Sequence, residues 1–156
     1  YRYFPDGKSA ILKEGFSAIS GDFMSPQEIL KMILDNDAHS IELFIQKYLL
    51  MHREHYQMHK AYDQAILKNQ EIFNRLQDNI REQVHVFFDQ MIEIEPRIKL
   101  LNQSQAEKAI LLNLNLLESV IHHHLFHTPV FENDEELVVY LVRIFQLTNM
   151  IYIKPS

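Results

Sequence analysis

The sequence has no cysteine and no tryptophan, and its 156 residues include only three glycines and five prolines. Without cysteine, the chain can form no disulfide, no thiolate metal site and no cysteine nucleophile. A chain without disulfides fits the cytoplasm, where we expect this protein to be. Few glycines and prolines, together with 47% hydrophobic residues, favour an all-α globular domain over a β-rich or disordered chain.

Long hydrophobic runs and an excess of positive charge are also missing. The apolar runs, such as 109–112 and 137–139, are interrupted by polar residues well before the roughly 20 residues that span a bilayer. We therefore expect no membrane partner. The formal net charge of -6 argues against non-specific nucleic-acid binding by these residues, because neutralising phosphates requires clustered Lys and Arg.

The motifs of common enzyme classes are absent from the sequence. There is no Gly-rich phosphate loop, no Gly-x-Ser-x-Gly elbow and no His-Glu-x-x-His segment. The acidic pair Glu93 and Glu95, next to Pro96, is typical of a solvated helix end. We expect no enzymatic activity and no cofactor.

Apolar residues recur at helical spacing along almost the whole chain. Gly21, Pro96 and Pro129 are plausible stops, because glycine favours a helix C-terminus and proline cannot donate a backbone hydrogen bond. The cleanest amphipathic stripe lies between 72 and 91. The predicted helices cover about residues 8–20, 26–36, 37–59, 60–69, 72–94, 104–127 and a last stretch that begins at 133 or 134.

Helix starts are marked by polar residues that can cap the first turn. Ser104, with Glu107 three residues later, has the spacing of a capping box, and the same relation occurs at 25–28. Asn133 or Asp134 can cap the last helix, whose first turn is acidic, as the helix dipole favours.

The last two predicted helices are apolar on more than one side. A helix of this kind must be covered on more than one face, and burial against a second subunit in a four-helix bundle explains it best. One large monomeric bundle remains the alternative. The residues that we predict at the dimer interface are Leu112, Leu116, Val120, His123, His127, Val139, Val142 and Leu147.

The chain begins with the segment 1–8, Tyr-Arg-Tyr-Phe-Pro-Asp-Gly-Lys. A Tyr-x-Tyr-Phe sequence, a Pro-Asp-Gly turn and a Lys that opens an amphipathic helix together resemble the end of the DNA-recognition helix in TetR-family transcriptional regulators. Gly7 adds one residue to the Phe-x-x-Lys spacing common in that family. The resemblance implies that 1–7 are the tail of a truncated helix-turn-helix domain and that 8–156 form the effector-binding and dimerisation domain.

The resemblance also implies a function. A TetR-like protein is a ligand-responsive transcriptional regulator, here a repressor that binds operator DNA as a homodimer and is released by a small apolar or aromatic effector. Contacts to DNA phosphates would fall on Tyr1, Tyr3 and Lys8, and a lysine in the first turn of a helix is well placed to bind an anion. The alternative is a helical scaffold or interaction domain with no DNA role.

Aromatic residues on the inner faces of the predicted helices suggest where an effector would bind. Small-molecule pockets combine apolar walls with a few directional polar groups, and His52 is such a polar group in the stripe of Phe44, Tyr48 and Tyr56. A core histidine bonded to a carbonyl is the alternative interpretation of His52. The predicted pocket residues are Phe16, Phe44, Tyr48, His52, Tyr56, Phe73, Phe87 and Phe88.

Nine histidines in a chain of this length raise the question of a metal site. One group, 52, 55 and 59, shares a helical face, and His123 and His127 form an i, i+4 pair. The one carboxylate at a suitable distance is Glu118, one turn before His122. We predict no metal, since such tracts also suit the polar rim of an interface; a histidine-based metal sensor stays open as an alternative.

Overall fold

The computed structural model describes residues 26–68 and 70–153, and all secondary structure in these two ranges is helical. The prediction of an all-α fold is therefore confirmed for them. The predicted helix at 8–20, and with it Tyr1, Tyr3, Lys8 and Phe16, lies outside the described residues. The elements are α2 (Pro26–Leu34), α3 (Ala38–Glu54), α4 (Tyr56–Lys68), α5 (Gln70–Ile94), the 3-10 helix η1 (Pro96–Leu100), α6 (Gln103–Phe126) and α7 (Asp134–Tyr152).

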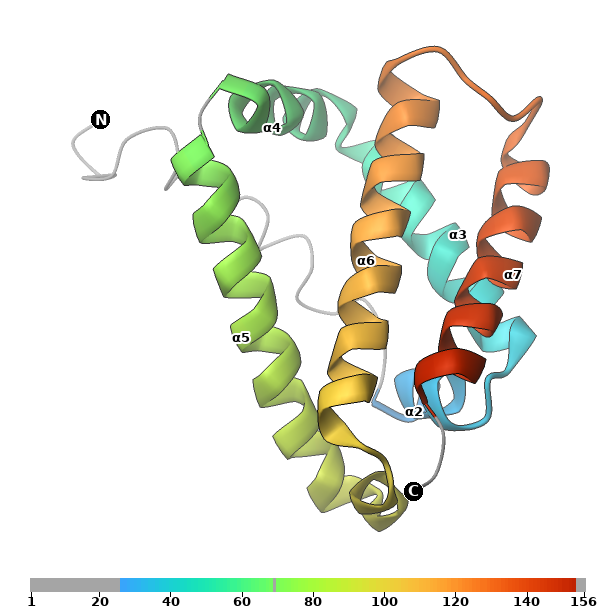
Figure 1. Ribbon diagram of the computed structural model, residues 1–156. Helices are drawn as coiled ribbons and strands as arrows, with labels where there is room; N and C mark the ends of the chain where they lie inside the picture. Colours follow the sequence, from blue (N-terminus) through green and yellow to red (C-terminus); the bar gives the residue numbers. More distant parts are fainter. Residues whose placement is uncertain (1–25, 69, 154–156) are drawn as a thin grey trace.

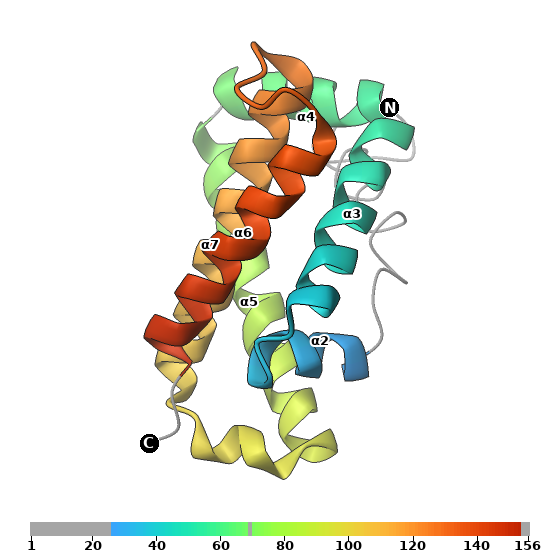
Figure 2. The same ribbon diagram turned by 90° about the vertical axis from the view of Figure 1, so that its right-hand side faces the viewer.

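Helix α6 lies at the centre of the arrangement, with α5 on one side and α7 on the other (Figure 1). Helix α3 packs against α7, and α2 lies beneath α3, as the turned view shows (Figure 2). Helix α4 lies across one end of the bundle, and η1 is at the opposite end (Figure 1). No helix in the described part of the chain is both long enough and apolar enough to cross a bilayer.

Two hydrophobic clusters hold these helices together. The larger one joins α3, α6 and α7 through fully buried residues such as Ile45, Leu117 and Leu141. The smaller one joins α5, η1 and the start of α6 around Phe88 and Ala106. Among the described side chains, α3, α5, α6 and α7 therefore bury apolar residues of the stripes that the sequence predicts, and burial of apolar area is the main term that stabilises the bundle.

Buried amide side chains connect the two ends of the described chain. Asn149 of α7 accepts a hydrogen bond from the Asn113 side chain at 3.2 Å and donates to the Met32 carbonyl at 3.1 Å. It also lies 3.2 Å from the side-chain oxygen of Asn36, which has a positive φ of 50° in the turn after α2. Gln146 donates to the Asn36 carbonyl. These amides fix the turn between α2 and α3 against α7, and no local pattern in the sequence marks them.

Several predicted helix boundaries are confirmed. Pro26 begins α2, and α5 ends at Ile94, two residues before Pro96. The side chain of Asn133 accepts a hydrogen bond from the Glu136 backbone N–H at 2.9 Å, so Asn133 rather than Asp134 caps α7.

Two boundary predictions are wrong. The helix predicted from 37 to 59 ends at Glu54, and a separate helix begins at Tyr56. The cap of α6 is Asn102, whose side chain accepts from the Gln105 backbone N–H, and not Ser104. Glu107 does not complete a capping box, because its carboxylate contacts the side chains of His85 and Gln103 instead.

The outer face of α7 is apolar and exposed. Positions 139, 143, 147 and 151 are four residues apart and share one face. Val139, Leu147 and Ile151 on this face are 51%, 54% and 64% exposed, and Arg143 is its single charged member. In Figure 2 no described helix lies in front of α7. The residues that bury α7 in its own protomer, such as Leu141 and Phe145, lie on the other side.

Some of the predicted interface residues of α6 and α7 are exposed, and others are half-buried within the protomer. Among the eight, Leu112, His123, His127, Val139 and Leu147 are exposed. The other three, Leu116, Val120 and Val142, are half-buried, and both valines pack against the larger cluster. Their assignment to a dimer interface stays a prediction.

Candidate functional site

Four titratable side chains from three helices meet inside the bundle. They are His52 of α3, His59 of α4, and Glu118 and His122 of α6, which we call the histidine–glutamate cluster. One ligand atom from each residue lies within 4.8 Å of those of the other three, a grouping that can hold a metal ion. His52 and His59 have no exposed surface, His122 is 7% exposed, and the side chain of Glu118 is 30% exposed.

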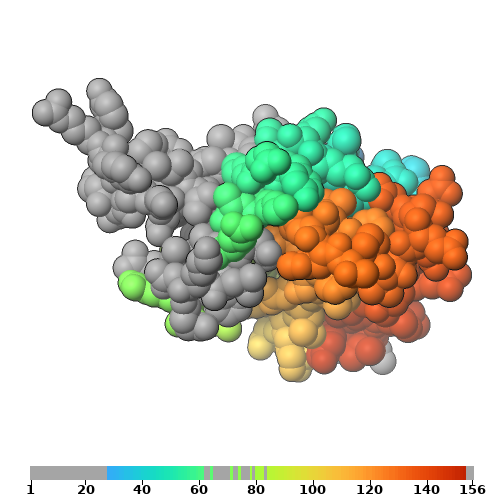
Figure 3. Space-filling model, turned by 90° about the horizontal axis from the view of Figure 1, so that it is seen from above, coloured from blue at the N-terminus to red at the C-terminus, as the bar shows by residue number. Residues whose placement is uncertain are grey.

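The break between α3 and α4 brings His52 and His59 together. In one continuous helix, two residues seven positions apart are about 10.5 Å apart along the axis. Instead, α3 ends with His55 as its C-cap, and the chain turns into α4 at Tyr56. The two rings stack with their centroids 3.8 Å apart. Seen from above, α4 lies beside the end of α6, which carries the other two members of the cluster (Figure 3).

Helix α6 supplies the carboxylate and the third imidazole from one of its faces. Glu118 and His122 are one turn apart, so their side chains are neighbours. His122 Nε2 lies 2.9 Å from Glu118 Oε1, and His52 Nε2 lies 3.3 Å from Glu118 Oε2. Glu118 is therefore at the centre of the cluster, with one imidazole at each carboxylate oxygen.

Tyr48 holds two members of the cluster in place. The ring of His52 is oriented by its Nδ1, which lies 2.9 Å from the Tyr48 carbonyl oxygen, one turn earlier in α3. The phenol of Tyr48 donates a hydrogen bond to Glu118 Oε2. A carbonyl oxygen can only accept, so Nδ1 of His52 carries a hydrogen and Nε2 is the atom directed at Glu118.

Burial and neighbouring groups lower the pKa values of two members of the cluster, His59 and Glu118. Burial, and then the nearby His52, lower the pKa of His59 from 6.5 to about 3, so this ring is neutral at neutral pH. Burial alone would raise the pKa of Glu118, but hydrogen bonds from His122 and His52 outweigh this effect and hold the pKa well below its usual value. The ring of Phe126 packs against the rings of both His122 and Tyr56.

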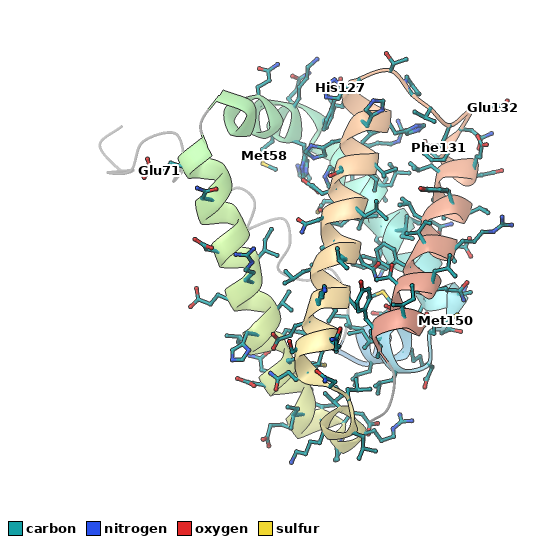
Figure 4. All side chains as sticks on the ribbon, viewed as in Figure 1. Met58, Glu71, His127, Phe131, Glu132 and Met150 are labelled. Atoms are coloured by element: carbon teal, nitrogen blue, oxygen red, sulfur yellow. The ribbon has the colours of Figure 1, made fainter. Side chains whose placement is uncertain are left out.

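The other histidines lie outside the cluster. His55, His123 and His127 are exposed. In Figure 4, His127 is at the end of α6, next to the loop that carries Phe131 and Glu132. His124 Nε2 lies 3.1 Å from Asp134, which also forms a two-point contact with Arg53. The two histidine groups seen in the sequence are thus divided: His52 and His59 enter the cluster and His55 does not, whereas neither member of the pair at 123 and 127 enters it.

The predicted pocket residues do not gather in one place. Phe44 is buried in the larger hydrophobic cluster and contacts Phe145. Phe88 is buried in the smaller cluster, with Phe87 packed against it. His52 belongs to the histidine–glutamate cluster, Tyr48 packs against His52, and Tyr56 packs against Phe126. The side chain of Phe73 is not among those that the structure describes. The assignment of these residues to an effector pocket stays a prediction.

A shallow hollow in the surface lies at the loop between α6 and α7, lined by residues that include Arg53, His124, Phe131 and Asp134. It is open to solvent, and the Arg53–Asp134 ion pair is part of its lining. None of the predicted pocket residues lines it.

Comparison with protein-family models, with curated proteins and with solved structures finds no match.

Proposed function

We propose that this chain is the effector-binding and dimerisation part of a ligand-responsive transcriptional regulator of the TetR type, a repressor that binds operator DNA as a homodimer. In this proposal the DNA-binding head lies before and around Tyr1, and Lys8 opens the helix that connects the head to the bundle. The proposal starts from the resemblance of residues 1–8 to the end of a recognition helix.

The observation that supports the proposal most directly is the outer face of α7. A protomer that worked alone would leave Val139, Leu147 and Ile151 in water, and contiguous exposed apolar surface is typical of an interaction site. A second copy of the chain is the occupant that fits, because α7 and its neighbour α6 are two long helices that can form a four-helix bundle across a twofold axis.

The mechanism follows from the dimer. Two heads on one dimer bind half-sites about one helical turn of DNA apart, roughly 34 Å. An effector that binds one arrangement of the helices better than another shifts the protein toward that arrangement, and a change in head separation then weakens operator binding. The effector would lie among the helices of the bundle.

DNA binding by the full-length gene product tests the proposal. Selection from a random DNA pool should yield a sequence with two symmetric half-sites. Lys8→Ala should weaken binding to all sequences alike and lower the salt dependence by about one phosphate contact, since a phosphate-bound lysine carries no sequence information. The matched control is Lys99→Ala, which changes an exposed lysine of η1. A dimer with no sequence preference for DNA would instead indicate a helical scaffold.

A further inference from the structure

The histidine–glutamate cluster is not accounted for by an apolar effector site. Apolar pockets place a few polar groups on a hydrophobic wall. Here three imidazoles and one carboxylate, from α3, α4 and α6, face one another, and the three imidazoles are almost completely out of water. Burying so many polar groups is unfavourable unless something compensates for the lost hydration.

The orientation of His52 shows what is needed to compensate. Because Nδ1 donates to the Tyr48 carbonyl, Nε2 is the ring nitrogen that faces Glu118 Oε2, 3.3 Å away. A cation held by both atoms, either a proton on Nε2 or a metal ion, would satisfy them together. Nε2 of His122 lies against the other oxygen of the same carboxylate and His59 stacks on His52, so more nitrogen atoms converge on this point than one proton can occupy.

We propose that His52, His59, Glu118 and His122 together bind one divalent transition-metal ion of the zinc class. Imidazole nitrogens and a carboxylate are the ligands that zinc, cobalt(II) and nickel(II) accept in the absence of thiolates. A tetrahedral ion with bonds of about 2.0–2.1 Å separates its ligand atoms by about 3.4 Å. The nitrogen–oxygen distances in the cluster, 2.9 Å from His122 to Oε1 and 3.3 Å from His52 to Oε2 of Glu118, are close to this separation.

The surroundings of the four ligands are those of a metal site. A ligating histidine usually donates its second N–H to a carbonyl or carboxylate, and His52 does so to Tyr48. The ligating carboxylate is itself held by a hydrogen bond, from the Tyr48 phenol. Four protein ligands fill a tetrahedral shell, which is typical of structural or regulatory sites and not of catalytic ones, where a position stays open for water.

The ion would fasten α4 to the bundle. Among the side chains of α4 that the structure describes, His59 alone is fully buried, whereas Tyr56, Met58 and Lys60 are half-buried. Figure 4 shows α4 beside the upper end of α6, on the side of α5, with Met58 on its lower side. Metal binding would therefore fix the turn at His55. This inference does not depend on the DNA role, since the ligands lie within one chain.

Cobalt(II) binding to the untagged, chelator-treated chain tests the site. We expect one cobalt per chain with the visible absorption bands of a four-coordinate ion, and zinc should displace it. Both His59→Gln and Glu118→Gln should weaken binding by more than about 100-fold, because changes even outside the ligand shell cost 10–100-fold. Zinc at about 100 times its Kd should raise the free energy of unfolding of the unaltered chain by about 2.7 kcal/mol, a gain that both variants should lose.

The matched control changes the exposed histidines His55, His123 and His127 to Gln in one chain, which should bind cobalt as the unaltered chain does. Circular dichroism of the metal-free variants shows whether each is folded; if His59→Gln is not, Glu118→Gln decides, since its side chain is nearly the same size and part-exposed. The proposal is wrong if the unaltered chain gives no four-coordinate bands, if the triple control loses them, or if folded Glu118→Gln keeps full affinity.

Discussion

Tyr48 contacts two members of the histidine–glutamate cluster with two different groups. Its carbonyl oxygen accepts from His52 and its phenol donates to Glu118. Tyr48→Phe removes the phenol and leaves the carbonyl, so His52 keeps its orientation while the carboxylate loses a fixed hydrogen bond. We expect the affinity for cobalt or zinc to fall about 10–100-fold, as for other outer-shell partners of metal ligands, with the stoichiometry still one per chain. Competition with a chelator of known affinity measures the change.

The control for this variant is Tyr140→Phe, which removes the hydroxyl of an exposed tyrosine on α7, away from the cluster. It should leave metal affinity unchanged. If Tyr48→Phe binds as tightly as the unaltered chain, the phenol does not orient a ligand, and the contact to Glu118 serves only the packing of α3 on α6.

Only some of the contacts within the cluster could be predicted from the sequence. The i, i+4 relation of Glu118 and His122 can be read directly, because helical spacing fixes it. The grouping of histidines 52, 55 and 59 assumes one continuous helix, and in such a helix the rings of 52 and 59 could not stack. His55, a ligand candidate in that grouping, is instead the C-cap of α3, where α3 ends and α4 follows, and it is exposed to solvent. Which histidines meet depends on how two helices cross, and periodicity within one helix carries no information about that.

At the scale of single helices, Asp37 is the N-cap of α3. Its carboxylate accepts from both the backbone N–H and the hydroxyl of Ser40 at 2.7 Å. These hydrogen bonds lower the pKa of Asp37 from 3.8. Its contribution to stability is therefore fully present above the unfolded-state pKa and is lost as pH falls through the lower folded-state pKa.

Asp37→Asn separates capping from charge, since asparagine is an equally good N-cap. We expect it to make the free energy of unfolding less dependent on pH below about 4, the range in which the unfolded aspartate takes up its proton. Asp37→Ala should lower stability at every pH. Urea denaturation on either side of this range measures both effects, and an unaltered acid slope in Asp37→Asn would show that other carboxylates dominate it.

The positions of most helices could be predicted because local rules decide them. Proline ends α5, an asparagine caps α7, and apolar spacing marks the buried side of each helix. The break at His55 could not be predicted, because its sequence contains neither Gly nor Pro and the apolar stripe continues through Tyr56. Tertiary packing decides it: turning α4 across the end of the bundle buries His59 against α3 and α6. The hydrogen bonds of the Asn113 and Asn149 amides could not be predicted for the same reason, since their partners lie on other helices.

At the scale of the whole molecule, the cluster and the outer face of α7 are in different places. The cluster lies where α4 crosses the end of the bundle, whereas the exposed apolar residues of α7 run along its side (Figures 1 and 2). Helix α6 belongs to both, because it carries Glu118 and His122 inward and Leu112 and His123 outward. A ligand that moved α6 could therefore act on an interface formed by α6 and α7.

The association of two chains through this face can be measured directly. At micromolar concentration we expect the chain to sediment as a dimer. Changing both Val139 and Leu147 to Glu should make it a monomer with unchanged helix content, because each twofold interface would then hold four carboxylates against apolar surface. The control is Val86→Glu, at a residue of α5 that is 48% exposed, close to the exposure of Val139. It should remain a dimer. A monomeric unaltered chain, or a dimer that survives the double change but not the control, would place the contact elsewhere and remove the main support for a TetR-like arrangement.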